Sequence, residues 1–149
     1  MSEIQNGRRH WMSILAQAPT EQLIELAEPF LAGAGFTTVR APQVGLVQVR
    51  ARMGGTGSRF NLGDVTLTRC VVQSTTGHYG HAYIRGRDKD HALQAAQLDA
   101  LLQDETLRGG IERQVVAPLR RLLERQRQQR ADETEATRVN FFTLVRGED

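Results

Sequence analysis

The chain has 149 residues, of which 40% are hydrophobic and 24% charged, and its formal net charge is +2 at pH 7. This length suits a single domain with a sizeable core. The near-zero charge argues against a dedicated nucleic-acid binder, whose basic side chains gather on one face. The one cysteine, Cys70, excludes an internal disulfide and a cysteine-built metal cluster within this chain.

The sequence contains no apolar run of the roughly 18 residues that a membrane-spanning helix needs. Its first residues, MSEIQNGRRHWM, lack the apolar centre of a secretory signal peptide. We therefore expect a cytoplasmic protein that does not contact a membrane.

Two amphipathic helices are predicted at the start of the chain. Residues 7–18 carry apolar side chains on one face at helical spacing: Trp11, Ile14, Leu15 and Ala18. Pro19 ends this helix, and Thr20 can cap a second helix, whose apolar stripe runs from Leu23 to Leu31. Pro29 is expected to kink or shorten this second helix, and Gly33 and Gly35 to end it. Such helices pack on a core or on a partner more often than they perform chemistry.

Four strands are predicted next, because apolar and polar residues alternate with period two between glycine- and proline-rich turns. A turn at residues 42–45 separates the first two strands, and a turn at residues 75–77 separates the last two. The strands cover residues 36–41, 47–53, 65–74 and 78–85. Short connections imply an antiparallel four-stranded meander.

The connection between the second and third strands is rich in glycine and bordered by arginine. Glycine adopts positive φ angles at little cost, which leaves backbone N–H groups open, and guanidinium groups beside them suit an anion. The candidate anion-binding residues are Arg52, Gly54, Gly55, Gly57, Arg59 and Arg69. A phosphate-binding P-loop and a dinucleotide fingerprint are excluded, since each requires a helix after the glycines. The alternative is a glycine-eased hairpin with solvated arginines.

The rest of the chain is predicted to be helical. Asp88 caps a helix over residues 88–105, with Asp99 close to its apolar seam, where a carboxylate is solvated, paired with arginine or catalytic. Gly109 and Gly110 are expected to break it, and a further helix is interrupted at Pro118. An apolar tail follows, with Val139, Phe141, Phe142, Leu144 and Val145, which we expect to be buried in this chain or in another.

Residues 120–130 consist largely of arginine, glutamine, glutamate and leucine. They allow an alternative function, a free-standing arginine-rich RNA-binding protein. Interleaved glutamate and the absence of aromatic residues favour a solvated helix face instead. The residues alone therefore predict an α+β domain, with an antiparallel four-stranded meander between N-terminal and C-terminal helices, that acts as an interaction subunit with an anion site.

Several motifs, in order along nearly the whole chain, resemble one known family. They are RHWMS from Arg9, GLVQ from Gly45, ARMGGTG from Ala51, GDVTLTR from Gly63, GRDK from Gly86 with His91 and Ala92, APL from Ala117, and TRV, FFT and VRG in the last 13 residues. They resemble PhnG, a subunit of the bacterial carbon–phosphorus lyase core complex. The resemblance implies a single PhnG-like domain over residues 1–149, helical in 1–35, a sheet in 36–86 and helical in 87–149.

The resemblance also implies a function in the use of organic phosphonates under phosphate starvation. With partner subunits PhnH, PhnI and PhnL, PhnG is required to join methylphosphonate to the ribose of ATP with release of adenine. The product is α-D-ribose 1-methylphosphonate 5-triphosphate. The chain is then an accessory subunit of a transferase and lyase system, with no complete active site and no catalytic residue of its own.

For partners and cofactors, the resemblance implies a two-fold symmetric hetero-oligomer with PhnH, PhnI and PhnJ. PhnL is a functional partner, required for the reaction. ATP is a substrate of the complex, and the iron–sulfur cluster and S-adenosylmethionine (SAM) belong to a partner subunit. This chain is expected to bind no cofactor, metal or nucleic acid. The residues expected at a partner interface are Trp11, Arg138, Phe141 and Phe142.

Overall fold

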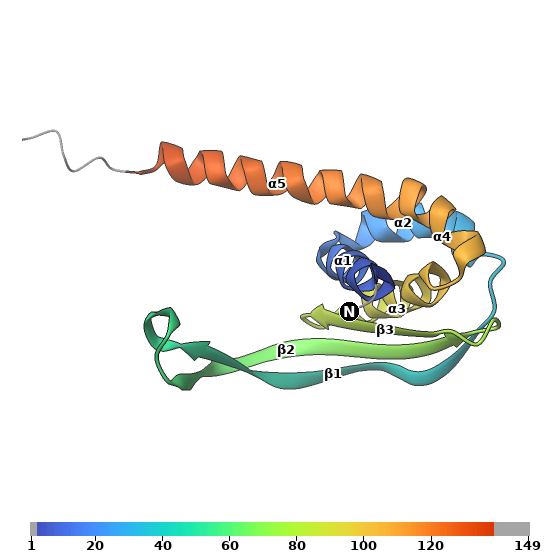
Figure 1. The fold of residues 1–149 in the computed structure, drawn as a ribbon, viewed down its shortest axis with the longest axis horizontal. Helices are drawn as coiled ribbons and strands as arrows, with labels where there is room; N and C mark the ends of the chain where they lie inside the picture. The colour runs from blue at the N-terminus through green and yellow to red at the C-terminus, as the bar shows by residue number, and fades with distance from the viewer. Residues whose placement is uncertain (1–2, 139–149) are drawn as a thin grey trace, which may run out of the picture.

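The computed structural model describes residues 3–138, in which helices cover one face of an antiparallel sheet (Figure 1). The α+β class predicted from the sequence is confirmed. The helices are α1 (Glu3–Gln17), α2 (Thr20–Leu31), α3 (Lys89–Leu102), α4 (Glu105–Ile111) and α5 (Ala117–Ala136). The strands are β1 (Phe36–Arg52), β2 (Arg59–Ser74) and β3 (Tyr79–Arg85), in the order β1-β2-β3.

The sheet has three strands, so the predicted four-stranded meander is wrong. The first two predicted strands are one continuous strand, β1, which passes through Pro42 without a turn. The pairing of β1 with β2 shifts register between Arg40 and Gln43, which marks a bulge at the proline. Proline is tolerated there because β1 lies at the edge of the sheet and the bulge removes the need for a ladder N–H.

The core lies between the sheet and α3, which is buried along most of its length. Gly80 of β3 permits this close approach, because a Cβ atom at Gly80 would lie 1.9 Å from the backbone oxygen of Ala96. On β2, Thr68, Cys70 and Val72 face the helices and are fully buried. Even-numbered residues of β2 therefore point to the helices, and odd-numbered residues point to the uncovered face.

Asp99 ties α1 and β3 to α3 from a fully buried position. Its carboxylate accepts hydrogen bonds from Arg8 Nη2 at 2.7 Å, from the Trp11 ring N–H at 2.9 Å and from the backbone N–H of His81 at 2.9 Å. A buried carboxylate is tolerated when it is paired and hydrogen-bonded in this way. The structure places Asp99 in a structural network, as the arginine-paired reading of the sequence anticipated.

The expected helix break at Gly109 and Gly110 is also wrong, because both residues lie inside α4. The break comes earlier, between α3 and α4, where Asp104 caps α4 and Arg108 donates to the backbone oxygen of Leu102 at 2.8 Å. A π-helical turn, Glu112–Val116, joins α4 to α5 and precedes Pro118. Proline suits the first turn of α5 because the N–H group it lacks has no helical partner there.

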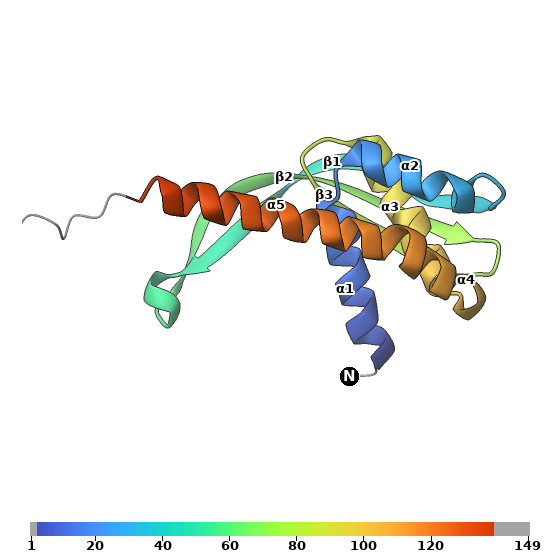
Figure 2. The same cartoon turned by 90° about the horizontal axis from the view of Figure 1, so that it is seen from above.

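Two elements project from this body in the same direction (Figures 1 and 2). One is the far end of the β1–β2 ribbon, and the other is the second half of α5. Residues 127–138 are exposed, and the last buried residue of α5 is Leu123. The helix is polar all round beyond that point, which is typical of a helix that crosses solvent.

Candidate functional site

Among residues 3–138, no third strand and no helix lies over the end of the β1–β2 ribbon. Strand β3 pairs with β2 only from Leu67 to Gln73, so residues 46–66 form a two-stranded ribbon, which we call the arm. The large apolar side chains exposed on the arm are Leu46, Val47, Val49, Met53, Phe60 and Leu62. An isolated two-stranded ribbon is at best marginally stable in water. Several large apolar side chains exposed on one element are typical of an interaction surface.

Both faces of the arm carry apolar residues. Directly opposed residues share a face, and Val47 lies opposite Val65 on the face away from the helices. Leu46 lies opposite Thr66 on the helix-side face, yet it is 71% exposed because none of the helices in the described range extends over it. An arm that is apolar on both faces fits between two surfaces of a partner better than it fits flat against one.

The glycine-rich connection at the tip has a structural explanation. Gly54 and Gly55 have φ angles of +59° and +79°, in the region that disfavours other residues. The Gly57 N–H donates to the Met53 oxygen at 2.8 Å, and a Cβ atom at Gly57 would lie 2.5 Å from that oxygen. The glycines are therefore required by the turn itself, whether or not an anion binds there.

The structure brings together five of the six candidate anion-binding residues. Arg52 and Arg59 are paired directly across the two strands at the base of the turn. Like charges in this position repel, and neither arginine forms an ion pair with a residue in the described range. Arg69 is the exception, because it follows Arg59 by ten residues of β2, roughly 33 Å of extended strand. It lies instead between Gln43 and Tyr83 in the three-stranded part.

Of the residues expected at a partner interface, Trp11 is 2% exposed and packs in the core of this chain. Arg138 is exposed just beyond the end of α5. Phe141 and Phe142 lie outside the described residues. The interface role of these four residues stays a prediction.

The alternating pattern does not identify Leu46 and Leu62, the exposed leucines of the arm. Strict alternation would bury one face, but the consecutive residues Leu46 and Val47 are both large and apolar, so the alternation fails here. An apolar pair of neighbours in a strand at the sheet edge was the available signal.

Other classes of site find little support in the part of the chain that the structure describes. No three histidine, cysteine, aspartate or glutamate side chains within it are placed to hold a metal ion. None of its helices is long and apolar enough to cross a membrane. Burial raises the pKa of the Cys70 thiol, which keeps the sulfur protonated and unreactive.

Comparison with known proteins gives the same family that the motifs indicated. Residues 6–147 match the family described as phosphonate metabolism protein PhnG. A protein of Rhizobium meliloti (strain 1021) is 41% identical over 145 residues, which covers 95% of this chain and 90% of that protein. That relative is named alpha-D-ribose 1-methylphosphonate 5-triphosphate synthase subunit PhnG.

Proposed function

The chain belongs to the PhnG family, and from this membership we propose that it is a subunit of an α-D-ribose 1-methylphosphonate 5-triphosphate synthase in phosphonate catabolism. In the reaction, a phosphonate oxygen of methylphosphonate bonds to C1′ of the ribose of ATP. The bond from C1′ to adenine breaks, and adenine leaves with a proton. The triphosphate stays on the ribose. This chain is an accessory subunit that the synthase requires, and catalysis belongs to other chains.

The structural observation that supports the role as a subunit is the exposed apolar arm. A chain that acts alone rarely presents so many large apolar side chains on both faces of one ribbon. A subunit buries them against a partner. The partners we propose are PhnH, PhnI and PhnJ in a two-fold symmetric hetero-oligomer in the cytoplasm, with PhnL needed for the reaction. The iron–sulfur cluster and SAM belong to a partner.

The test is co-expression of the tagged chain with PhnH, PhnI and PhnJ. Leu62→Ser on the arm should reduce the amount of partner that co-purifies and, with PhnL added, the release of adenine from ATP and methylphosphonate. The matched control is Leu107→Ser on α4, an exposed leucine away from the arm. Assembly and adenine release unchanged by Leu62→Ser would remove the arm as the docking element. A chain that never co-purifies with these proteins would remove the proposed function itself.

The opposed arginines favour a second role for the arm tip. We propose that Arg52 and Arg59 receive an anion in the complex, either a carboxylate of a partner or the triphosphate of the substrate. Planar guanidinium groups hold such groups with two hydrogen bonds, which an ammonium group does not reproduce. Arg52→Lys should then keep assembly and lower the rate of adenine release. Arg69→Lys is the matched control, because Arg69 lies far from the turn.

The C-terminal tail is proposed to contribute to assembly. It carries Phe141 and Phe142, and loss of a buried phenylalanine costs about 3–5 kcal/mol. A chain truncated before Arg138 should therefore fail to form the complex in size-exclusion chromatography. Assembly in normal yield without the tail would show that the tail is dispensable.

A further inference from the structure

The outer edge of β3 is only partly closed by the residues that the structure describes. Backbone groups alternate in direction along β3. Those of Gly80, Ala82 and Ile84 face β2, and those of the residues between them point away from β2. At the first half of this edge, the His81 N–H donates to Asp99, and the Tyr79 oxygen accepts from Arg8 and Gln103. These side chains close the edge as a strand would.

The second half of the edge remains open. The outward backbone groups there are the carbonyls of His81 and Tyr83 and the amides of Tyr83 and Arg85, because direction alternates along a strand. None of them hydrogen-bonds to a residue in the range 3–138, and β3 has no neighbour on this side. These groups have the spacing that the backbone of another extended strand matches.

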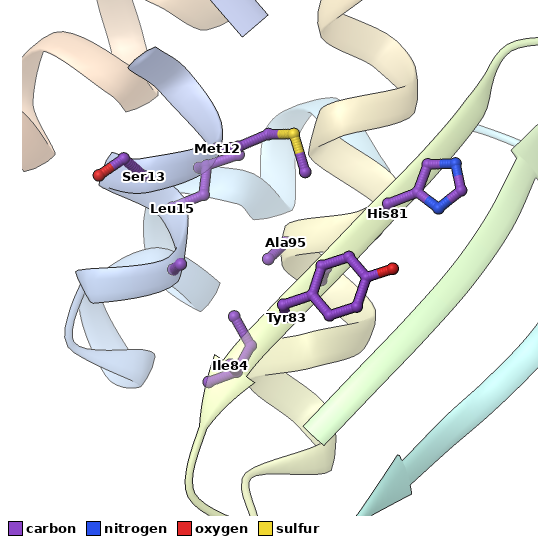
Figure 3. A pocket seen from close by; sticks show the side chains of 9 residues that line it. Met12, Ser13, Leu15, His81, Tyr83, Ile84 and Ala95 are labelled. Carbon is purple, nitrogen blue, oxygen red and sulfur yellow. The ribbon is translucent and has the colours of Figure 1, made fainter. Parts of the chain in front are cut away.

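A groove runs beside this open edge, between α1 and β3 (Figure 3). Its volume is about 180 Å³, and Met12 reaches from α1 in the direction of β3. The apolar part of its lining comes from Met12, Leu15, Ala16, Ala82, Ile84 and Ala95. Ala82 and Ile84 point to the helix side of the sheet, so a strand added at this edge would place every second side chain in the groove.

We propose that an extended segment of a partner subunit adds to β3 as a further strand, with an apolar side chain in the groove between α1 and β3. The segment pairs with Tyr83 and Arg85, and the bonds of Asp99, Arg8 and Gln103 stop it at His81 and so set its register. The side chain that follows the apolar one in the incoming segment lies beside Tyr83, which is 54% exposed on the uncovered face of the sheet. The identity of the partner rests on the proposed function.

The charged residues near the open edge indicate a second property of the incoming segment. Arg85, at the open end of the edge, is exposed and forms no ion pair with a described residue, and Arg87 and Lys89 follow it. Asp88 and Asp90 lie among these cations. The Asp88 carboxylate is occupied by Thr20 and the backbone N–H of His91, and Asp90 lies in the first turn of α3, beyond the end of β3. A carboxylate on the incoming segment therefore finds a complementary charge beside Arg85. An extended chain that is apolar at one position and acidic near one end fits both features.

Hydrogen exchange of the backbone amides tests this proposal in the intact complex. The amides of Tyr83 and Arg85 should exchange at least about tenfold more slowly when the chain is co-expressed with PhnH, PhnI and PhnJ than when it is alone. The amide of His81 serves as the internal reference, because Asp99 already accepts its hydrogen bond in the free chain. Equal rates for Tyr83 and Arg85 in the two samples would overturn the proposal, even if the complex forms.

Two variants of Tyr83 distinguish the contribution of its backbone N–H to partner binding from that of its side chain. Tyr83→Pro removes the outward N–H and should lower partner recovery at least about tenfold, while pairing with β2 is kept because this N–H points away from β2. Tyr83→Ala keeps the N–H and should retain most of the binding. Ala16→Phe fills the groove but leaves the backbone groups of β3 unchanged, and it should also reduce recovery. Normal recovery with both Tyr83→Pro and Ala16→Phe would overturn the proposal.

A second candidate for the open edge of β3 is the tail of this chain, residues 139–149, and the experiment must distinguish it from a partner segment. A chain truncated after Arg138 should show the same fast exchange at Tyr83 and Arg85 as the full chain alone. If these amides are protected in the full chain alone and become exposed on truncation, then the tail fills the edge, and the partner-segment proposal is wrong.

Discussion

The two ends of the β1–β2 ribbon differ in their surroundings although their residues are similar. At one end, Cys70 and Val72 are fully buried under α3. At the other, Leu46 and Leu62 are 71% and 67% exposed. Apolar residues in a strand therefore indicate which residues need cover, and not whether this chain supplies it. The body supplies its own cover, whereas no element within residues 3–138 covers the arm.

Asp99→Ala should produce the largest loss of stability, because it removes the acceptor at the centre of the body. It leaves Arg8, the Trp11 ring N–H and the His81 N–H without their partner, and breaking a buried pair costs about 3–5 kcal/mol. The comparison is Asp64→Ala on the exposed arm, expected to change the free energy of unfolding by less than about 0.5 kcal/mol. Denaturant unfolding measures both. Equal losses would contradict the division into body and arm.

Gly80→Ala should be next, because its Cβ would lie 1.9 Å from the Ala96 oxygen and 2.7 Å from the Ala100 nitrogen. Backbone atoms cannot move aside as a side chain does, so we expect a loss of about 2–3 kcal/mol. The comparison is Gly45→Ala beside the arm. A Cβ atom at Gly45 would lie in open space, so this variant should change the free energy of unfolding by less than about 0.5 kcal/mol. Similar melting temperatures for the two variants would show that α3 does not press on β3.

Asp88 links the stability of the body to pH. The hydrogen bond from Thr20, followed by that from the His91 N–H, holds the pKa of Asp88 below its ordinary value of 3.8. Its contribution is complete above that pH and is lost as the pH falls below it, because protonation weakens both bonds. Asp88→Asn keeps an N-cap, so its unfolding free energy should fall less between about pH 5 and about pH 3. Parallel pH curves for the two proteins would contradict this.

Leu62→Ser should have the smallest effect on the isolated chain. Its side chain is already exposed, so the free energy of unfolding should change by less than about 0.5 kcal/mol, whereas the same variant should weaken assembly. Thermal unfolding of the chain alone, beside recovery of partners from the co-expressed complex, measures the two effects. A marked loss of stability in the chain alone would mean that the arm is supported by this chain.

Local signals determined much of the fold. Helical spacing predicted both α1 and α2, although α1 begins at Glu3, before the predicted residue 7, and the capping residue Asp88 fixed the start of α3. Local signals failed at Pro42, which was read as a turn, and at Gly109 and Gly110, which were read as a break. A proline in an edge strand and glycines in a packed helix are decided by neighbours that lie far away in the sequence.

The sequence by itself determined the family, the α+β class and a glycine turn flanked by arginines. Only the tertiary structure decided that Arg52 and Arg59 face each other while Arg69 lies elsewhere, because a strand separates residues by about 3.3 Å at each step. It also decided that Asp99 is buried and that no other element within residues 3–138 covers residues 46–66. Burial depends on which element lies above a residue, and no local pattern in the chain carries that information.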